Sequence, residues 1–296
     1  MRRILAVMLV AATLGACGTT DAQTPTTSDA PSPATGPMST PTVVPEPVPD
    51  EATTTVELWY SITATHMGEA LFVVHRDIPS TPGIGAAALR LWLEGPSAEE
   101  KAVGVHGAVP EGVELLGLDI DDGTAIVDLS AEFENTNMGT SGESLLLEQL
   151  AWTLTQFPTV DRVRVKIDGE FKDHYMGHGF IIDEEHPLER NERDPLSPIV
   201  VSVPHFGAHF ASGDAVAGTA NVFEANVSIR LLDEGGDILF DGFTTATCGT
   251  GCRGDYSKSI RFDVDHEQRG AIELFEVSAE DGSETNKVTV PVVLVP

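Results

Sequence analysis

Basic residues and cysteines are scarce in this chain of 296 residues. Its 17 Lys and Arg residues stand against 46 Asp and Glu residues, which gives a formal net charge of −29 at pH 7. A surface of that sign repels phosphate backbones, and we therefore exclude nucleic acid as a partner. With 3 cysteines, the chain also lacks the second cysteine pair that would complete a cysteine-built zinc site.

Motifs for catalysis are missing as well. We find no Gly-x-Ser-x-Gly elbow around a nucleophile, and the Gly83-x-Gly85 stretch lacks the Lys-Ser/Thr of a phosphate-binding loop. Carboxylates are too numerous for a glycosidase-like pair to be singled out. The sequence therefore predicts no enzyme, no catalytic residue and no cofactor.

One apolar run stands at the beginning of the chain. It extends from Ile4 to Leu14 behind Arg2-Arg3, and it is too short for a stable membrane span. Leu14-Gly15-Ala16-Cys17 has the pattern of a lipobox, so we expect a lipoprotein signal peptide over residues 1–16 and a diacylglyceryl group on Cys17. The alternative is a plain secretory signal with an incidental cysteine. Either way the protein is exported, and the lipobox predicts an extracytoplasmic location on the cell membrane.

Residues 17–52 follow as a segment rich in Pro, Thr and Ser, with too little apolar material to bury. Proline favours extended polyproline II, so we expect a disordered tether that lifts the folded part away from the membrane.

The remaining cysteines form an even pair, Cys248 and Cys252. In Cys248-Gly249-Thr250-Gly251-Cys252, the two glycines let the backbone turn tightly enough to bring the sulfurs together. Oxidation is the expected state outside the cytoplasm, so we predict a disulfide. Half of a zinc site is the competing interpretation.

Residues 53–190 show both strand and helix periodicity. We expect strands at Thr55–Tyr60, Ala70–His75, Val113–Asp121, Thr124–Leu129 and Val160–Ile167, and helices at Gly85–Glu94 and Thr140–Phe157. Asp122-Gly123 is a hairpin signal, and Thr140-x-x-Glu143 has the spacing of a capping box. The order β-β-α-β-β-α-β predicts an α+β domain with helices layered on a sheet.

Residues 195–296 lose the helical period and carry short strands about every ten residues. Seven such strands fit an immunoglobulin-like all-β sandwich. They are Ile199–Val203, Ala215–Asn221, Val227–Leu232, Ile238–Thr245, Ser257–Val264, Ala271–Ser278 and Lys287–Leu294.

Both domains resemble known families. The segments Leu93–Pro96, Asp122–Ser130, Gln149–Thr155 and Val163–Gly169 are similar to a GerMN domain of sporulation and germination proteins. Gly218–Val227 and Phe275–Gly282 resemble the immunoglobulin-like domain of bacterial spore-germination proteins. The resemblance implies an envelope-associated, non-enzymatic role, with a GerMN fold related to ring-building and scaffold modules. It brings no catalytic residue with it.

Three patterns have a functional alternative. His174-x-x-x-His178, close to Asp173 and to Asp183-Glu184-Glu185-His186, could supply metal ligands, but Gly177 and Gly179 oppose a helix there and favour a solvated loop. Asp119–Gly123 resembles the start of a calcium loop, but a hairpin turn explains it better. Arg253-Gly254-Asp255 spells an adhesion tripeptide, which short chance matches also produce.

Together these patterns predict a lipid-anchored envelope protein that holds protein–protein or protein–wall contacts, with envelope proteins or peptidoglycan as partners. The alternative is an extracytoplasmic receptor that binds a solute or a cation, through the acidic surface and the segment from Asp173 to His186.

Overall fold

The computed structural model describes residues 52–65, 67–190 and 194–296, which belong to one compact unit, Asp50–Pro296. The predicted signal peptide, Cys17 and nearly all of the predicted tether lie outside the described residues. Within the described part of the chain, no helix is both long enough and apolar enough to cross a membrane.

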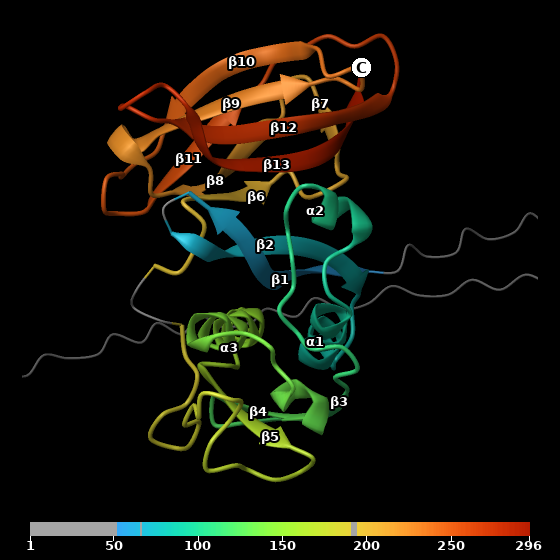
Figure 1. Cartoon of the computed structure of the whole chain (residues 1–296). Coiled ribbons are helices and arrows are strands. Elements are labelled where there is room, and N and C mark those ends of the chain that lie inside the picture. The colour runs from blue at the N-terminus through green and yellow to red at the C-terminus, as the bar shows by residue number, and fades with distance from the viewer. Residues whose placement is uncertain (1–51, 66, 191–193) are drawn as a thin grey trace, which may run out of the picture. The chain divides into compact units, whose positions relative to one another are not determined.

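The first half contains two sheets with helices between them (Figure 1). Strands β1 (Thr53–Ala64) and β2 (Gly68–Pro79) pair as an antiparallel hairpin. The second sheet has the order β3-β4-β5, in which β3 and β4 are antiparallel and β4 and β5 are parallel. Its strands are β3 (Leu115–Asp121), β4 (Thr124–Leu129) and β5 (Arg162–Ile167).

Helices α1 (Ile84–Glu94) and α3 (Thr140–Leu154) fill the layer between the hairpin and this sheet, and a short α2 (Ala98–Ala102) follows α1. The α+β class is confirmed. The sequence pattern implied a single sheet, but the strands form two, because the connection from α1 to β3 carries the chain to the far side of the helices.

The expected capping box at Thr140-x-x-Glu143 is wrong. Thr140 is already the first helical residue of α3, its N-cap is Gly139, and no side chain caps that end. The same pattern at Ser97-x-x-Glu100 does form a capping box, at the start of α2. Glu143 is therefore free to make contacts outside its own helix.

The second half is a two-sheet sandwich. One sheet has the order β10-β9-β12-β13-β7 and the other the order β11-β8-β6. The strands are β6 (Ile199–Val203), β7 (His209–Ala211), β8 (Ala215–Ala220), β9 (Asn226–Leu232), β10 (Ile238–Thr245), β11 (Gly254–Ser259), β12 (Gln268–Val277) and β13 (Glu284–Val295). The immunoglobulin-like class is confirmed. The predicted strand at Ser257–Val264 begins and ends earlier than expected, and β7 was not predicted.

Buried apolar residues of both halves form one continuous cluster. The β1–β2 hairpin joins them because both of its faces are covered. Trp59 packs against Trp152 of α3 with ring centroids 4.7 Å apart. Phe72 lies edge-on to Phe206, which belongs to the connection between β6 and β7, at 6.2 Å. The hairpin is thus part of two interfaces at once.

The edge of β2 is also paired with the start of the second half. Leu71 donates its N–H to the carbonyl of Pro195 at 2.8 Å and accepts from the N–H of Ser197 at 2.7 Å. These bonds extend the hairpin by one bridge, between Leu71 and Leu196.

Candidate functional site

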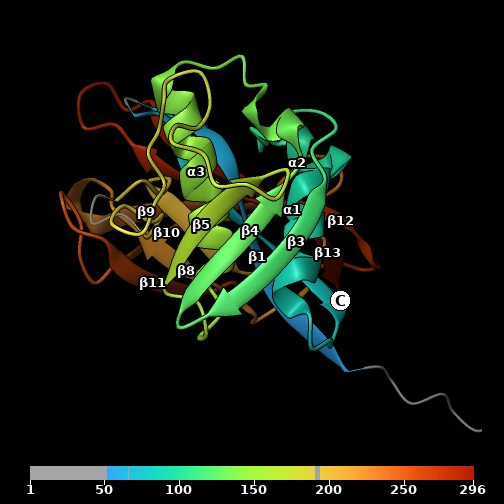
Figure 2. The same cartoon turned by 90° about the horizontal axis from the view of Figure 1, so that it is seen from below.

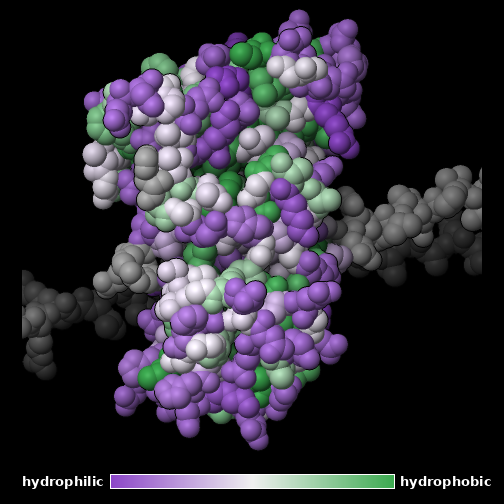
Figure 3. Space-filling model, viewed as in Figure 1, coloured by the Kyte–Doolittle hydropathy of each residue, from purple (hydrophilic) through white to green (hydrophobic). Residues whose placement is uncertain are grey.

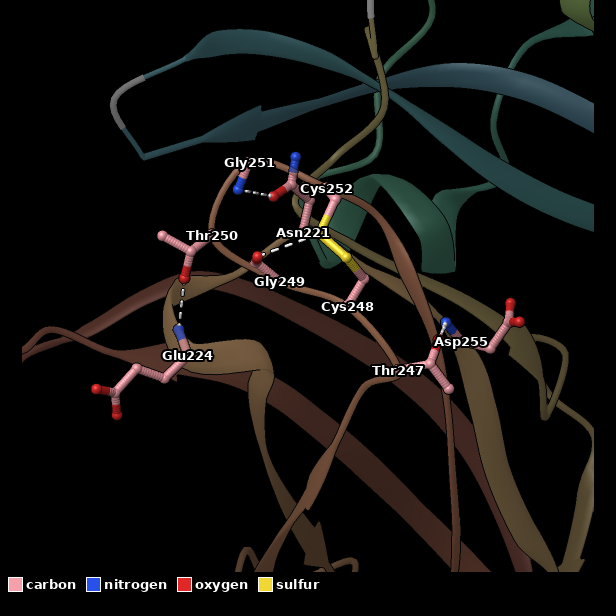
Figure 4. The surroundings of a disulfide bond; sticks show 9 residues. All are labelled: Asn221, Glu224, Thr247, Cys248, Gly249, Thr250, Gly251, Cys252 and Asp255. Atoms are coloured by element: carbon pink, nitrogen blue, oxygen red, sulfur yellow. Dashed lines mark hydrogen bonds between the residues drawn. A yellow bond between two sulfur atoms is a disulfide. The ribbon is translucent and has the colours of Figure 1, made fainter.

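Cys248 and Cys252 form a disulfide, with their Cα atoms 5.7 Å apart, in the connection between β10 and β11 (Figure 4). This is the pair named in the sequence analysis. The hydroxyl of Thr250 accepts from the N–H of Glu224 at 2.9 Å, and the following glycine donates to the Asn221 side chain at 3.0 Å. The loop is therefore bound to the turn before β9.

Two glycines are required by the close approach of this loop to its neighbours. A Cβ atom on Gly249 would lie 2.4 Å from the backbone nitrogen of Ala225, and one on Gly254 would lie 2.0 Å from that of Cys248. No side chain fits in these spaces, so the loop sequence is set by packing as well as by the disulfide.

Arg253, directly after the loop, binds the segment that joins the two halves. Its Nε donates to the carboxylate of Asp194 at 2.8 Å, and one Nη donates to the carbonyl of Ser197 at 2.9 Å. The other Nη reaches the carbonyl of Thr219 in β8 at 3.4 Å. Because the guanidinium is committed to these groups and only 17% exposed, it cannot act as the arginine of an adhesion tripeptide.

Glu143 is a buried carboxylate that holds two loops against α3. Its side chain is 1% exposed. It accepts hydrogen bonds from the hydroxyl of Thr136, from Nδ1 of His178 at 2.8 Å and from the backbone N–H groups of Gly177 and His178 at 3.3 and 3.2 Å. Burial alone would raise the pKa of Glu143, but these hydrogen bonds outweigh it and lower the pKa below its ordinary value.

This use of His178 bears on the metal alternative. His174 and His178 lie in a loop, not on a helix face, and His178 is turned toward Glu143. His186 forms a local pair with Asp183 at 3.0 Å. Among the residues that the structure describes, no three His, Cys, Asp or Glu side chains gather in a group that could hold a metal ion.

Asp122 and Gly123 form the turn between β3 and β4, with φ angles of 45° and 73°. The two strands pair directly across it, as the hairpin interpretation predicts. The carbonyl of Gly123 accepts from the N–H of Asp161 at 2.8 Å, which fixes the turn against the beginning of β5.

Charged groups also lie where the halves meet. Arg76 of β2 binds Glu100 of α2, with one N–O distance of 2.5 Å, and the Glu100 side chain is 2% exposed. Beside them, the rings of His75 and His205 stack with centroids 4.3 Å apart. Burial and the neighbouring His205 lower the pKa of His75 to about 4, so this imidazole is neutral at pH 7.

Hydrophilic residues cover most of the face shown in Figure 3, in keeping with the net charge of −29. The sequence did not single out the structural roles of Glu100, Glu143 and Arg253. Only Glu100 had a local signal, the capping-box spacing from Ser97. His178, which binds Glu143, lies 35 residues away in the chain, and Asp194, which binds Arg253, lies 59 residues away.

Two families of known proteins match separate parts of the chain. Residues 44–173 match the family described as "Germane: Sporulation and spore germination". Residues 198–283 match the "Immunoglobulin-like domain of bacterial spore germination".

The chain is 33% identical over 110 residues to the spore germination protein GerM of Bacillus subtilis, and this match covers 36% of the chain and 29% of GerM. Two solved structures are also similar. The first GerMN domain of B. subtilis GerM has 27% identity and a TM-score of 0.35, covering 47% of this chain and 98% of that one. The tandem GerMN domains of the same protein have 20% identity and a TM-score of 0.38, covering 71% and 62%. The chain is therefore similar to sporulation and spore germination proteins over residues 44–173 and to the immunoglobulin-like domain of bacterial spore germination over residues 198–283, and it spans less than a third of the length of GerM.

Proposed function

We propose that the protein is a lipid-anchored scaffold of the cell envelope, held to the membrane through Cys17, which binds envelope proteins or the wall and catalyses no reaction. The lipobox and the Pro-rich segment support the anchor and its tether. The Cys248–Cys252 disulfide agrees with an oxidising compartment outside the cytoplasm.

The observation that carries this proposal is the tandem of two germination-type domains that share one core. Both domains pack against the β1–β2 hairpin. They are also joined by the hydrogen bonds of Leu71 to Pro195 and Ser197, and by those of Arg253 to Asp194 and Ser197. Such a body suits a protein that presents surfaces to neighbours at a set distance from the membrane.

Metabolic labelling tests the anchor. Cells that express the full chain should incorporate a labelled fatty acid into it, and Cys17→Ala should remove both the label and the retention in the membrane fraction. The oxidised state is read on the same sample, because Cys248 and Cys252 should react with an alkylating reagent only after reduction. A mature form without acyl groups, free in the medium, contradicts the anchor.

The scaffold role is tested separately by crosslinking in intact cells and by incubating the purified chain with peptidoglycan. We expect specific envelope proteins in the crosslinked products and no release of soluble wall fragments. Steady release of fragments with turnover contradicts a non-enzymatic role. A rise in melting temperature with a metal ion or a small solute favours the receptor alternative instead.

A further inference from the structure

Strand β3 has an open edge. It is the outer strand of the β3-β4-β5 sheet, and Figure 2 shows it beyond β4. Within the described residues, its backbone hydrogen bonds go to β4 alone. The opposite edge of the sheet is different, because Val163 of β5 exchanges two hydrogen bonds with Leu188, at 2.8 and 2.9 Å. An unpaired edge is a template for the addition of another strand.

Apolar side chains lie beside this edge. Ile120 pairs in register with the buried Ala125, which places Ile120 on the side of the sheet that faces the helices, yet its side chain is 44% exposed. A surface pocket of about 270 Å³ adjoins it, lined by Ile120, Leu118, Pro82, Ile84 and Phe157 among others. A strand added along β3 would therefore find an apolar groove for the residues on its inner face.

The outer face of β3 is acidic. Asp119 and Asp121 alternate with Leu118 and Ile120 and are exposed. Neither carboxylate forms a salt bridge with a described residue. A strand added to this edge would place alternate side chains next to these carboxylates, where Lys or Arg is favoured and Asp or Glu is repelled.

We propose that the β3 edge binds an extended segment of another envelope protein in which apolar and basic residues alternate. The segment adds as a strand to the sheet, inserts its apolar side chains beside Ile120 and pairs its basic side chains with Asp119 and Asp121. Backbone hydrogen bonds would give the affinity, and the alternating side chains the specificity. This inference rests on the proposed scaffold function and names the chemistry of one partner.

A second copy of the chain fits the edge less well. The strand of this chain in which basic and apolar residues alternate is β5, Arg162-Val163-Arg164-Val165-Lys166-Ile167. The outer edge of β5 is already paired, because Val163 forms a bridge with Leu188. Phe171 also lies over Arg164 and Lys166, at 4.1 and 5.1 Å from its ring centroid, so these basic side chains are partly covered. The partner must therefore bring a basic strand that is not yet paired.

The test uses the full chain with Cys17→Ala and a fluorescent peptide of the sequence Arg-Val-Arg-Val-Lys-Ile, which has the required alternation. We expect a saturable rise in fluorescence anisotropy that weakens as salt is added. The variant Asp119→Asn with Asp121→Asn should weaken binding roughly tenfold, because two charge contacts are lost. The matched control, Glu267→Gln with Glu280→Gln, changes the net charge equally at exposed sites of the second half and should leave the affinity within about twofold.

Three further peptides separate strand addition from simple charge attraction. A peptide with the same side chains but N-methylated at alternate residues, one with the same composition in scrambled order, and one with Glu in place of Arg and Lys should all bind at least roughly tenfold more weakly. Equal binding of the N-methylated or scrambled peptide overturns the proposal. So does an unchanged affinity of the Asp119/Asp121 variant.

Sedimentation of the same variants identifies a competing occupant. If the wild-type chain self-associates and the Asp119/Asp121 variant is monomeric, the edge serves a second copy and the proposal is wrong. If the peptide binds but no envelope protein is crosslinked in cells, the scaffold function is contradicted. The proposed strand addition at the β3 edge is then still supported. Crosslinked partners without peptide binding would contradict the edge alone.

Discussion

The two halves of the chain place their charged residues in different ways. In the GerMN-type half, the carboxylates of Glu100 and Glu143 are buried: Glu100 binds Arg76 of β2, and Glu143 fixes two loops to α3. In the immunoglobulin-like half, Arg230 and Lys287 bind Glu273 and Glu284 in a network on the sheet surface. The loops on either side of α3 are held by a buried carboxylate of that helix, whereas the Arg230 and Lys287 network lies on strands β9, β12 and β13. The same acid-rich composition therefore serves packing in one half and the surface in the other.

The largest effect is expected from Arg76→Ala. It leaves the Glu100 carboxylate, 2% exposed, without its cation, and breaking a buried pair in this way costs about 3–4 kcal/mol. Urea denaturation at pH 7 measures the loss of unfolding free energy. The control is Arg269→Ala, whose side chain is 85% exposed and 3.7 Å from Glu99, and which should change stability by less than about 0.5 kcal/mol. Equal losses for the two variants would remove the distinction between buried and exposed pairs.

Glu143→Gln should have the next largest effect, about 2–3 kcal/mol, since charge-assisted bonds from Thr136 and His178 are weakened in a buried site. The loop around His178 should become sensitive to proteolysis before the rest of the protein unfolds. The measurement is limited proteolysis together with urea denaturation. Glu184→Gln, with a side chain 86% exposed, is the control and should leave the loop intact.

The third prediction concerns the pH dependence of stability that arises from His75, which stacks on His205 where the two halves meet. The pKa of His75 is lowered to about 4 in the fold against 6.5 for an ordinary histidine, so the unfolded chain binds the proton first as the pH falls. Stability should decrease by about 2 kcal/mol between pH 7 and pH 5 from this group alone. His75→Gln should flatten that part of the pH profile, and His209→Gln, with a side chain 69% exposed, should not. If His75→Gln leaves the dependence of stability on pH unchanged, burial of this histidine is not the cause of the acid sensitivity.

The smallest effect is expected in the surface network of the second half. Lys287→Gln removes contacts of 2.6 Å to Glu284 and 3.3 Å to Glu273, but the lysine is 37% exposed and Arg230 remains beside both carboxylates. We expect a loss of about 0.5 kcal/mol that disappears at high salt. A loss as large as that of Arg76→Ala would mean that both halves depend on their charges equally.

Local patterns in the sequence predicted the elements that depend on neighbouring residues. The strand Thr124–Leu129 was placed correctly because apolar and polar residues alternate after the Asp122-Gly123 turn, and Ile199–Val203 was placed correctly as a continuous apolar run. Strand β7, with three residues, was missed because it is defined by its parallel pairing with the end of β13, more than eighty residues later.

The candidate site was less accessible to sequence analysis. Thr140-x-x-Glu143 and Ser97-x-x-Glu100 have the same spacing, and nothing local shows that only the second one caps a helix. The role of Glu143 depends on a loop that returns to α3 from beyond β5. The binding of Arg253 to Asp194 depends on how the two halves dock. Such contacts follow from topology, which a single sequence does not specify.

The hairpin buried on both faces has a practical consequence for dissection of this protein. Truncation near residue 195 would remove Leu196, Val200 and Phe206. It would expose apolar side chains on both faces of β2, among them Leu71, Phe72 and Val73. A fragment ending there would be prone to aggregate, and its poor behaviour would say little about the intact molecule. Studies of either half are therefore better done by substitution within the whole chain than by truncation.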